Sequence, residues 1–229
     1  MSKKNTAATI ATIVVAVLAI ATTLFLLYQT SQQQIQENQY NYVPSDEVNE
    51  EMNMNAVTLI KNNCEVFRIY LQYGLPHQAE PYNNVPEDGY YTVKSDNYKT
   101  ISDVEAVVNS TFVEKEAKRI LTNINGDNVA VYAEETDDDG NKGIGLDVSM
   151  VDENGRFKAI AYDYTWSNAK FTLHPKSNTE CDIIVELNPA EETSSAENAS
   201  SGSDDSNTKK VTANMLKVNG EWRLQKLVY

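Results

Sequence analysis

The chain has 229 residues and carries 33 acidic against 19 basic side chains, a formal net charge of −14. Such a surface repels nucleic acid and anionic lipid headgroups, which excludes a nucleic-acid-binding function and favours a basic protein partner or simple solubility. The sequence contains no CxxC pair, no GxSxG or HExxH motif and no phosphate-binding glycine loop, so we expect neither a cofactor nor a metal.

The first predicted element is a transmembrane helix over Ala7–Tyr28. This segment is uncharged and long enough to cross a bilayer core of about 30 Å. Lys3 and Lys4 precede it, so the positive-inside rule places residues 1–6 in the cytoplasm and the remainder outside the plasma membrane. A cleaved signal peptide with the site Ala19-Ile20-Ala21 is the alternative, and it also delivers the domain outside the cytoplasm. The lipid bilayer is therefore an expected partner.

Residues 29–44 are polar and predict a stalk, followed by one extracytoplasmic domain over 45–229. Within this domain, apolar residues recur at steps of three and four from Val48 to Leu71, which predicts a helix capped by Ser45. Several asparagines near Asn62 have low helix propensity, so a helix interrupted at this point is an alternative.

Two further helices are predicted from capping boxes. In each box a hydroxyl side chain precedes a glutamate by three residues and satisfies the free N–H groups of the first turn. The first box pairs Ser102 with Glu105, and the second pairs Thr111 with Glu114 and opens a helix that ends after Leu121. The domain should therefore contain about three helices.

The remaining segments alternate apolar and polar residues between turns and predict strands. They are Tyr90–Lys94, Val129–Glu134, Ile144–Val151, Phe157–Trp166, Ala169–His174, Cys181–Leu187, Val211–Val218 and Trp222–Tyr229. The dipeptide Asn219-Gly220 predicts a tight hairpin between the last two. Residues 189–208 are acidic and of low complexity, which predicts a disordered loop inside the sheet. The expected class is α+β, with about three helices packed on one curved antiparallel sheet of six to seven strands.

Two surface features are candidates for partner contact. The first is an acidic run that could meet a basic protein; its members are Glu134, Glu135, Asp137, Asp138 and Asp139. The run has the alternate spacing of a calcium loop, but Lys142 and Val148 occupy the positions of the required glycine and glutamate, so a solvated hairpin tip is favoured. The second comprises Tyr162, Tyr164 and Trp166, which alternate on one predicted strand face. That face is either a sugar- or peptide-binding platform or one wall of the core.

The sequence offers little for catalysis. Cys64 and Cys181 lie in apolar surroundings and form either a disulfide or two buried thiols. A dyad of Cys64 with His174 lacks a nucleophile motif. An enzymatic or small-ligand alternative would require Asp163, Tyr164 and His174 to converge inside the sheet.

The stretch from Val66 to Leu121 contains VFRIYLQYGLP followed by GYYTVKSDNYKTISDVEAVVNSTFVEKEAKRIL. It resembles the DL-endopeptidase inhibitor (IseA) family of Gram-positive bacteria, with that family's YYxV strand at Tyr90 to Val93 and its helix start at Tyr98 to Glu105. The closing VNGEWRLQKLVY resembles that family's last hairpin, which cystatin-like and nuclear-transport-factor-like domains share. The resemblance implies a non-enzymatic protein that binds NlpC/P60 peptidoglycan endopeptidases and blocks their clefts.

The sequence therefore predicts a membrane-anchored, extracytoplasmic, non-catalytic binding module, with inhibition of a cell-wall endopeptidase as its specific form. A basic protein or a cell-wall hydrolase is the expected partner. Two other hypotheses stay open: a small-ligand-binding or enzymatic cone-shaped α+β domain, and a structural subunit of an envelope complex.

Overall fold

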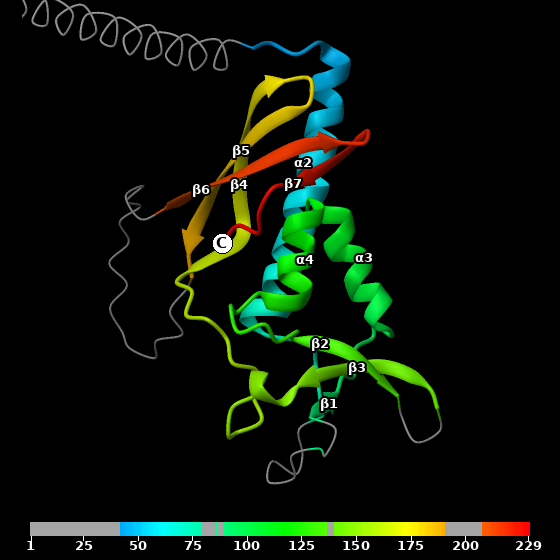
Figure 1. Cartoon of the computed structure of the whole chain (residues 1–229). Coiled ribbons are helices and arrows are strands. Elements are labelled where there is room, and N and C mark those ends of the chain that lie inside the picture. The colour runs from blue at the N-terminus through cyan, green and yellow to red at the C-terminus, as the bar shows by residue number, and fades with distance from the viewer. Residues whose placement is uncertain (1–41, 79–85, 87–88, 137–139, 191–207) are drawn as a thin grey trace, which may run out of the picture.

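The computed structural model of the protein describes residues 42–78, 86, 89–136, 140–190 and 208–229. These ranges form an α+β domain, which confirms the predicted class (Figure 1). The predicted single sheet is wrong, because the strands form two antiparallel sheets in the orders β1-β3-β2 and β4-β5-β6-β7. The described helices lack the length and apolar composition needed to span a bilayer, and the predicted span Ala7–Tyr28 lies outside the described residues.

The helical elements are α2 (Asp46–Phe67), the π-helix η1 (Arg68–Gln72), α3 (Ile101–Thr111), α4 (Glu114–Asn123) and the 3-10 helix η2 (Val148–Met150). The small sheet contains β1 (Tyr90–Thr92), β2 (Tyr132–Thr136) and β3 (Lys142–Asp147). The large sheet contains β4 (Tyr164–Ser177), β5 (Glu180–Pro189), β6 (Lys209–Val218) and β7 (Glu221–Leu224). In Figure 1 the large sheet lies beside α2 and the small sheet lies beyond its lower end.

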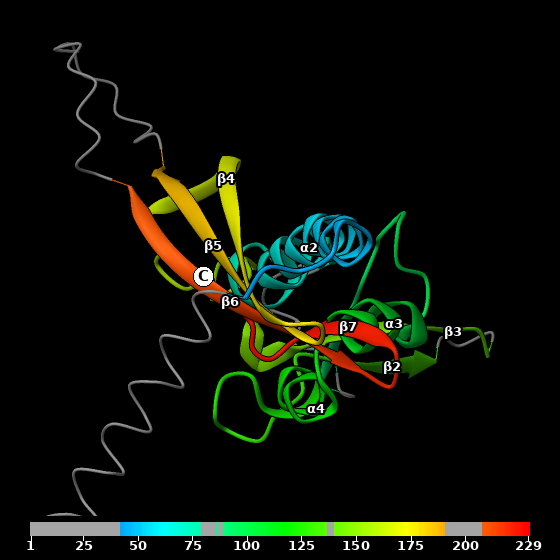
Figure 2. The same ribbon diagram turned by 90° about the horizontal axis from the view of Figure 1, so that it is seen from above.

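The core is one cluster of buried side chains from α2, α3, α4 and both sheets. The buried side of α2 carries Met52, Ala56, Leu59 and Phe67, at the steps of three and four that the sequence predicted. Along β5 burial alternates residue by residue, from Cys181 to Leu187. This period of two places one face of the sheet against the helix. Figure 2 shows that β4, β5 and β6 fan apart at one end and converge at the other, as a strongly twisted sheet does.

The predicted cap and hairpin signals have mixed outcomes. The Ser45 side chain accepts a hydrogen bond from the Val48 N–H and begins α2, and Asn219-Gly220 has φ of 52° and 86°, so both of these predictions are confirmed. The break near Asn62 is absent, since α2 continues to Phe67.

Both predicted capping boxes are misplaced. The helix α3 begins after Thr100, whose N–H donates at 2.8 Å to the carboxylate of Asp103, so Ser102 already lies inside the helix. The Thr111 hydroxyl donates backwards to the Val107 carbonyl at 2.6 Å, and α4 begins after Val113 instead. Thr111 is thus the last residue of α3, and the N-cap position of α4 is taken by Val113, which makes no side-chain cap bond.

The strand boundaries differ most around β4. The predicted strands Phe157–Trp166 and Ala169–His174 are one element from Tyr164 onward, with an irregularity between Thr165 and Lys170 where Asn168 has φ of 57°. Residues before it leave the sheet: the Ile160 N–H donates to the Leu71 carbonyl of η1 at 2.9 Å. Asn168 therefore marks a bulge within a strand, and not a turn between strands.

The last predicted strand, Trp222–Tyr229, ends early at Leu224. The Gln225 N–H still donates to the Asn214 carbonyl of β6, but Leu227 and Val228 bond to helices. The amide of buried Asn63 donates to the Val228 carbonyl at 2.8 Å and accepts from the Val228 N–H at 3.0 Å. The Leu227 N–H donates to the Glu116 carboxylate at 2.9 Å. We call residues 225–229, held by Asn63 and Glu116, the clamped segment.

Asn63→Ala should lower the free energy of unfolding by about 2–3 kcal/mol, because it leaves the N–H and carbonyl of Val228 without partners in a dry site. The adjacent Asn62→Ala is the matched control and should change stability by less than about 0.5 kcal/mol. Urea unfolding followed by tryptophan fluorescence measures both. Equal effects of the two substitutions would show that the Asn63 bonds do not hold the clamped segment.

The stability that Glu116 gives to the clamped segment should depend on pH. Burial opposes ionisation of this carboxyl, but hydrogen bonds from Arg119 and the Leu227 N–H outweigh burial and lower its pKa from 4.5. A lowered folded-state pKa means that the stabilisation is present above pH 4.5 and is lost as the pH falls through the lowered value. Glu116→Gln should therefore reduce the urea midpoint at pH 7, and the gap to the unsubstituted chain should narrow at pH 3.

The exposed neighbour Glu114 supplies the control, since Glu114→Gln should leave the urea midpoint unchanged at both pH values. A gap between Glu116→Gln and the unsubstituted chain that stays constant from pH 7 to pH 3 would contradict the proposed ionic contribution.

Candidate functional site

A cleft of about 810 Å³ lies at the fanned end of the large sheet. One side is formed by the end of α2 and by η1, including Cys64, Arg68 and Tyr73. The other side is formed by the residues around the start of β4 and by the end of β5, including Trp166 and Asn188. The volume falls within the range of small-molecule and cofactor sites, roughly 300–1,000 Å³.

The π-helix positions one wall of this cleft. Over Arg68–Gln72 the backbone is wound more loosely than an α-helix, and π-helical turns of this kind occur frequently at functional sites. The turn ends at Gly74, which has φ of +67° and whose position leaves no room for a β-carbon, since one would lie 2.5 Å from the Phe157 ring. The end of the helix is fixed further by the Tyr132 hydroxyl, which donates to the Ile69 carbonyl at 2.6 Å and accepts from the Leu75 N–H at 2.8 Å.

Aromatic rings form the floor and walls of the cleft. Phe67 packs against Tyr162 with ring centroids 4.9 Å apart and stacks on Tyr229 at 5.4 Å. Tyr164 meets Tyr162 edge-on at 6.1 Å, and the Lys209 Nζ lies 5.2 Å from the centroids of both rings. These contacts have the separations at which aromatic pairs and cation–π pairs are attractive.

The structure thus brings together the predicted residues Tyr162, Tyr164 and Trp166, all of which line the cleft. Sequence reasoning missed Phe67, Arg68, Tyr73, Asn188 and Tyr229, which reach the same place from α2, η1, β5 and the clamped segment. The only signal was the aromatic and basic character of the end of the first helix, FRIYLQY, which was used to predict a helix but not a site.

Two hydrogen-bond donors of the lining side chains have no acceptor. The Tyr162 hydroxyl and the Trp166 Nε1–H are inaccessible to water and make no hydrogen bond within the described ranges. Each such donor costs about 1–3 kcal/mol of stability. Burial, together with the nearby Cys64 and Tyr164, raises the pKa of Tyr162 to about 12, so this phenol stays protonated and remains a donor.

The charge of the cleft differs from that of the whole chain. Among the described residues that line it there is no carboxylate, and Arg68 is the one charged side chain. The Arg68 guanidinium donates from Nε and Nη2 to the two Glu65 oxygens at 3.1 and 3.0 Å, which leaves Nη1 without a hydrogen bond among the described residues. About half of the Arg68 side chain is exposed. A guanidinium in this state can still bind an incoming oxygen acceptor.

Of the two alternatives for the cysteines, the structure contains the free thiols: Cys64 and Cys181 are not bonded to each other. Cys64 lines the cleft from α2, whereas Cys181 is buried near the start of β5, seven residues before the cleft-lining Asn188. Burial raises the pKa of Cys64 to about 12 and that of Cys181 to about 11, so neither thiol is activated.

The constellation expected for an enzyme does not assemble. Of its three members only Tyr164 lines the cleft, while Asp163 is exposed and His174 lies on the exposed face of β4 opposite Asp182. For the same reason His174 does not lie in the cleft that Cys64 lines, so their dyad is not formed there.

The acidic run is described only in part. Glu134 pairs with Lys142 at 2.9 Å, and Glu135 accepts from the Thr92 hydroxyl at 2.8 Å. Asp137, Asp138 and Asp139 lie outside the described residues, so their role in partner contact stays a prediction. In the part of the chain that the structure describes, no three His, Cys, Asp or Glu side chains are grouped to hold a metal ion.

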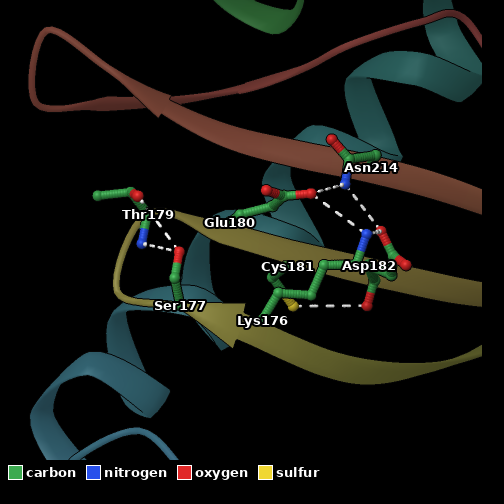
Figure 3. A network of polar contacts seen from close by, with 7 residues as sticks. All are labelled: Lys176, Ser177, Thr179, Glu180, Cys181, Asp182 and Asn214. Carbon is green, nitrogen blue, oxygen red and sulfur yellow. Dashed lines mark hydrogen bonds and ion pairs between the residues drawn. The ribbon is translucent and has the colours of Figure 1, made fainter. Parts of the chain in front are cut away.

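A second polar cluster lies on the outer face of the large sheet (Figure 3). Lys176 pairs with Glu180 at 3.2 Å and with Asp182 at 2.9 Å, and the Asn214 amide donates to both carboxylates. Burial opposes the charge of Lys176, but its bonds to Asp182 and Glu180 raise its pKa. One cation thus faces two carboxylates, and the Asn214 amide and Lys176 bond both of them. Because these contacts join three neighbouring strands, we interpret the cluster as a brace across β4, β5 and β6 rather than a binding site.

Comparison with known proteins gave no match, either to a protein-family model or to a curated protein. The function is therefore argued from the geometry of the cleft.

Tyr162 and Tyr132 provide a matched pair for testing the cleft. Tyr132→Phe should lower the free energy of unfolding by about 2 kcal/mol, because it leaves the Ile69 carbonyl and the Leu75 N–H without their hydrogen-bond partner. Tyr162→Phe should leave stability equal or about 1 kcal/mol higher, because it removes a donor that has no acceptor. Urea unfolding measures both. A large loss of stability in Tyr162→Phe would mean that the hydroxyl has a structural partner and is not held for a ligand.

Proposed function

We propose that this protein is a non-catalytic binding module of the cell envelope and that the aromatic cleft is its recognition site. The proposal rests on the residues that line the cleft. Among the described ones are several aromatic rings, two donors without acceptors (the Tyr162 hydroxyl and the Trp166 N–H), one cation (Arg68) and no carboxylate. Residues held in this way without internal partners are typical of sites that complete their bonding with a ligand.

The same lining favours recognition over chemistry. General acid–base catalysis requires a titratable group poised near the working pH. The cleft offers the Cys64 thiol, whose pKa is raised to about 12, and phenols such as Tyr162, whose pKa is also raised to about 12. Both stay protonated at neutral pH, so they can donate hydrogen bonds but are poor bases and nucleophiles.

The envelope location depends on the expected anchor Ala7–Tyr28 and the charges before it. A domain held outside the plasma membrane meets cell-wall polymers and the enzymes that cut them. The resemblance of residues 66–121 to the endopeptidase inhibitors makes an NlpC/P60 enzyme the first partner to test.

The full chain in detergent should bind an NlpC/P60 endopeptidase and slow its cleavage of peptidoglycan in proportion to the occupied fraction. Tyr73 stands at the rim of the cleft with 65% of its surface exposed, so Tyr73→Ala should weaken binding tenfold or more. Met54→Ala is the control, since Met54 is equally prominent, at 61% exposed, but does not line the cleft. Calorimetry and a peptidoglycan-release assay measure the two effects.

Unslowed cleavage at saturating protein would remove the inhibitor form of the proposal. Equal losses for Tyr73→Ala and Met54→Ala would show that recognition takes place elsewhere on the domain.

A further inference from the structure

The cleft has two smaller hollows beside it, of about 510 and 450 Å³, and Arg68 lines all three. Cys64 is shared by the cleft and the 510 Å³ hollow, and Asn97 and Tyr98 are shared by the two smaller ones. We call the three hollows together the groove. A ligand that reaches from one hollow to the next past Arg68 has to be extended rather than compact.

The side chains of the cleft match the surface of a saccharide. A sugar ring presents one flat face of C–H groups, which packs on an aromatic ring, and an edge of hydroxyls that both donate and accept. Tyr164 and Trp166 supply rings, while Thr165, Asn168 and Asn188 supply hydroxyl and amide groups of both polarities. The unpaired Tyr162 and Trp166 donors would gain acceptors from sugar oxygens once the side chains adjust to admit them.

A peptide strand fits the same place poorly. Extended peptides bind by adding to a sheet edge, which requires a regular row of backbone N–H and C=O groups. The strand β4 is an edge strand, but its register breaks between Thr165 and Lys170, where Asn168 has φ of 57°. The edge is therefore interrupted where it borders the cleft.

The charges of the groove favour an acidic ligand. Arg68, Lys61 and Lys94 line it against Glu65 and Asp96, and Glu65 is held by Arg68 and the Tyr98 hydroxyl. The groove is thus locally basic in a chain whose net charge is −14. The exposed Nη1 edge of Arg68 has the geometry to pair with a carboxylate.

We propose that the groove binds an extended saccharide bearing carboxylate groups, with a carboxylate on Arg68 and neighbouring sugar rings on Tyr164 and Trp166. The inference rests on the proposed binding function and names the class of ligand that the cleft takes.

The full chain in detergent is titrated with three probes: an octasaccharide in which N-acetylglucosamine alternates with glucuronate, a neutral N-acetylglucosamine hexasaccharide, and an oligoglutamate peptide. Calorimetry gives the affinities, and tryptophan emission reports on the site, because Trp222 is buried and a ligand-dependent change belongs to Trp166. The acidic saccharide should bind at least tenfold more tightly than the neutral one, and the peptide should not bind.

Arg68→Gln should remove the tenfold preference for the acidic saccharide, and Arg68→Lys should restore part of it. Trp166→Ala should weaken both saccharides. Arg156→Gln is the control, because Arg156 is exposed and lines none of the three hollows, and it should change nothing. Circular dichroism of each variant confirms that it is folded.

Three results would overturn the inference: binding of neither saccharide, undiminished binding by folded Arg68→Gln, or oligoglutamate bound as tightly as the acidic saccharide. Loss of endopeptidase binding in Tyr73→Ala, alongside no saccharide binding, would refute only the ligand class and leave the binding module standing.

Discussion

The domain depends on the pair of hydrogen bonds between the Asn63 amide and the backbone of Val228. A primary amide presents one donor and one acceptor side by side, so Asn63 acts for the clamped segment as a neighbouring strand would. Because Glu116 holds Leu227 from α4, the segment ties together two helices and the large sheet. Its position in turn places Tyr229 on Phe67, at the base of the aromatic cluster. A polar contact thus helps to position a ring that stacks on Phe67, one of the lining residues of the cleft.

Some buried hydroxyl and N–H groups near the cleft are fully hydrogen-bonded, and others have no partner. The Tyr132 hydroxyl is fully paired with the backbone of Ile69 and Leu75 and locks the end of the helical run. The Tyr162 hydroxyl and the Trp166 indole have no such partners, although they are as inaccessible to water. Stability alone would favour apolar replacements at these two positions. A role of the Tyr162 hydroxyl and the Trp166 indole in binding a ligand would explain why these polar groups are present.

Some local signals predicted local structure correctly. Ser45, the apolar face of α2 and the Asn219-Gly220 hairpin are set by neighbours in sequence, and each appears where the pattern indicated. The two capping boxes were misplaced although they are also local. At the first, Thr100 and Asp103 compete with Ser102 and Glu105 for the same helix start. Choices that depend on distant partners were missed as well. Asn168 resembles a turn residue, but β5 pairs with β4 on both sides of it, so the strand continues. The split into two sheets likewise follows from packing along α2, which a pattern of alternating residues does not encode.

The sequence predicted one of the two walls of the cleft. The alternation of Tyr162, Tyr164 and Trp166 indicated this wall. The facing wall comes from the end of a helix that is π-helical, with one more residue per turn than the α-helix that the pattern predicted. Each α-helical residue advances the chain by about 100° around the axis. A π-helical turn takes one residue more than an α-helical turn, so the residues after it are rotated relative to a continuous α-helix. Removing one residue between 68 and 72 should therefore turn the wall that bears Tyr73 and Gly74 away from β4.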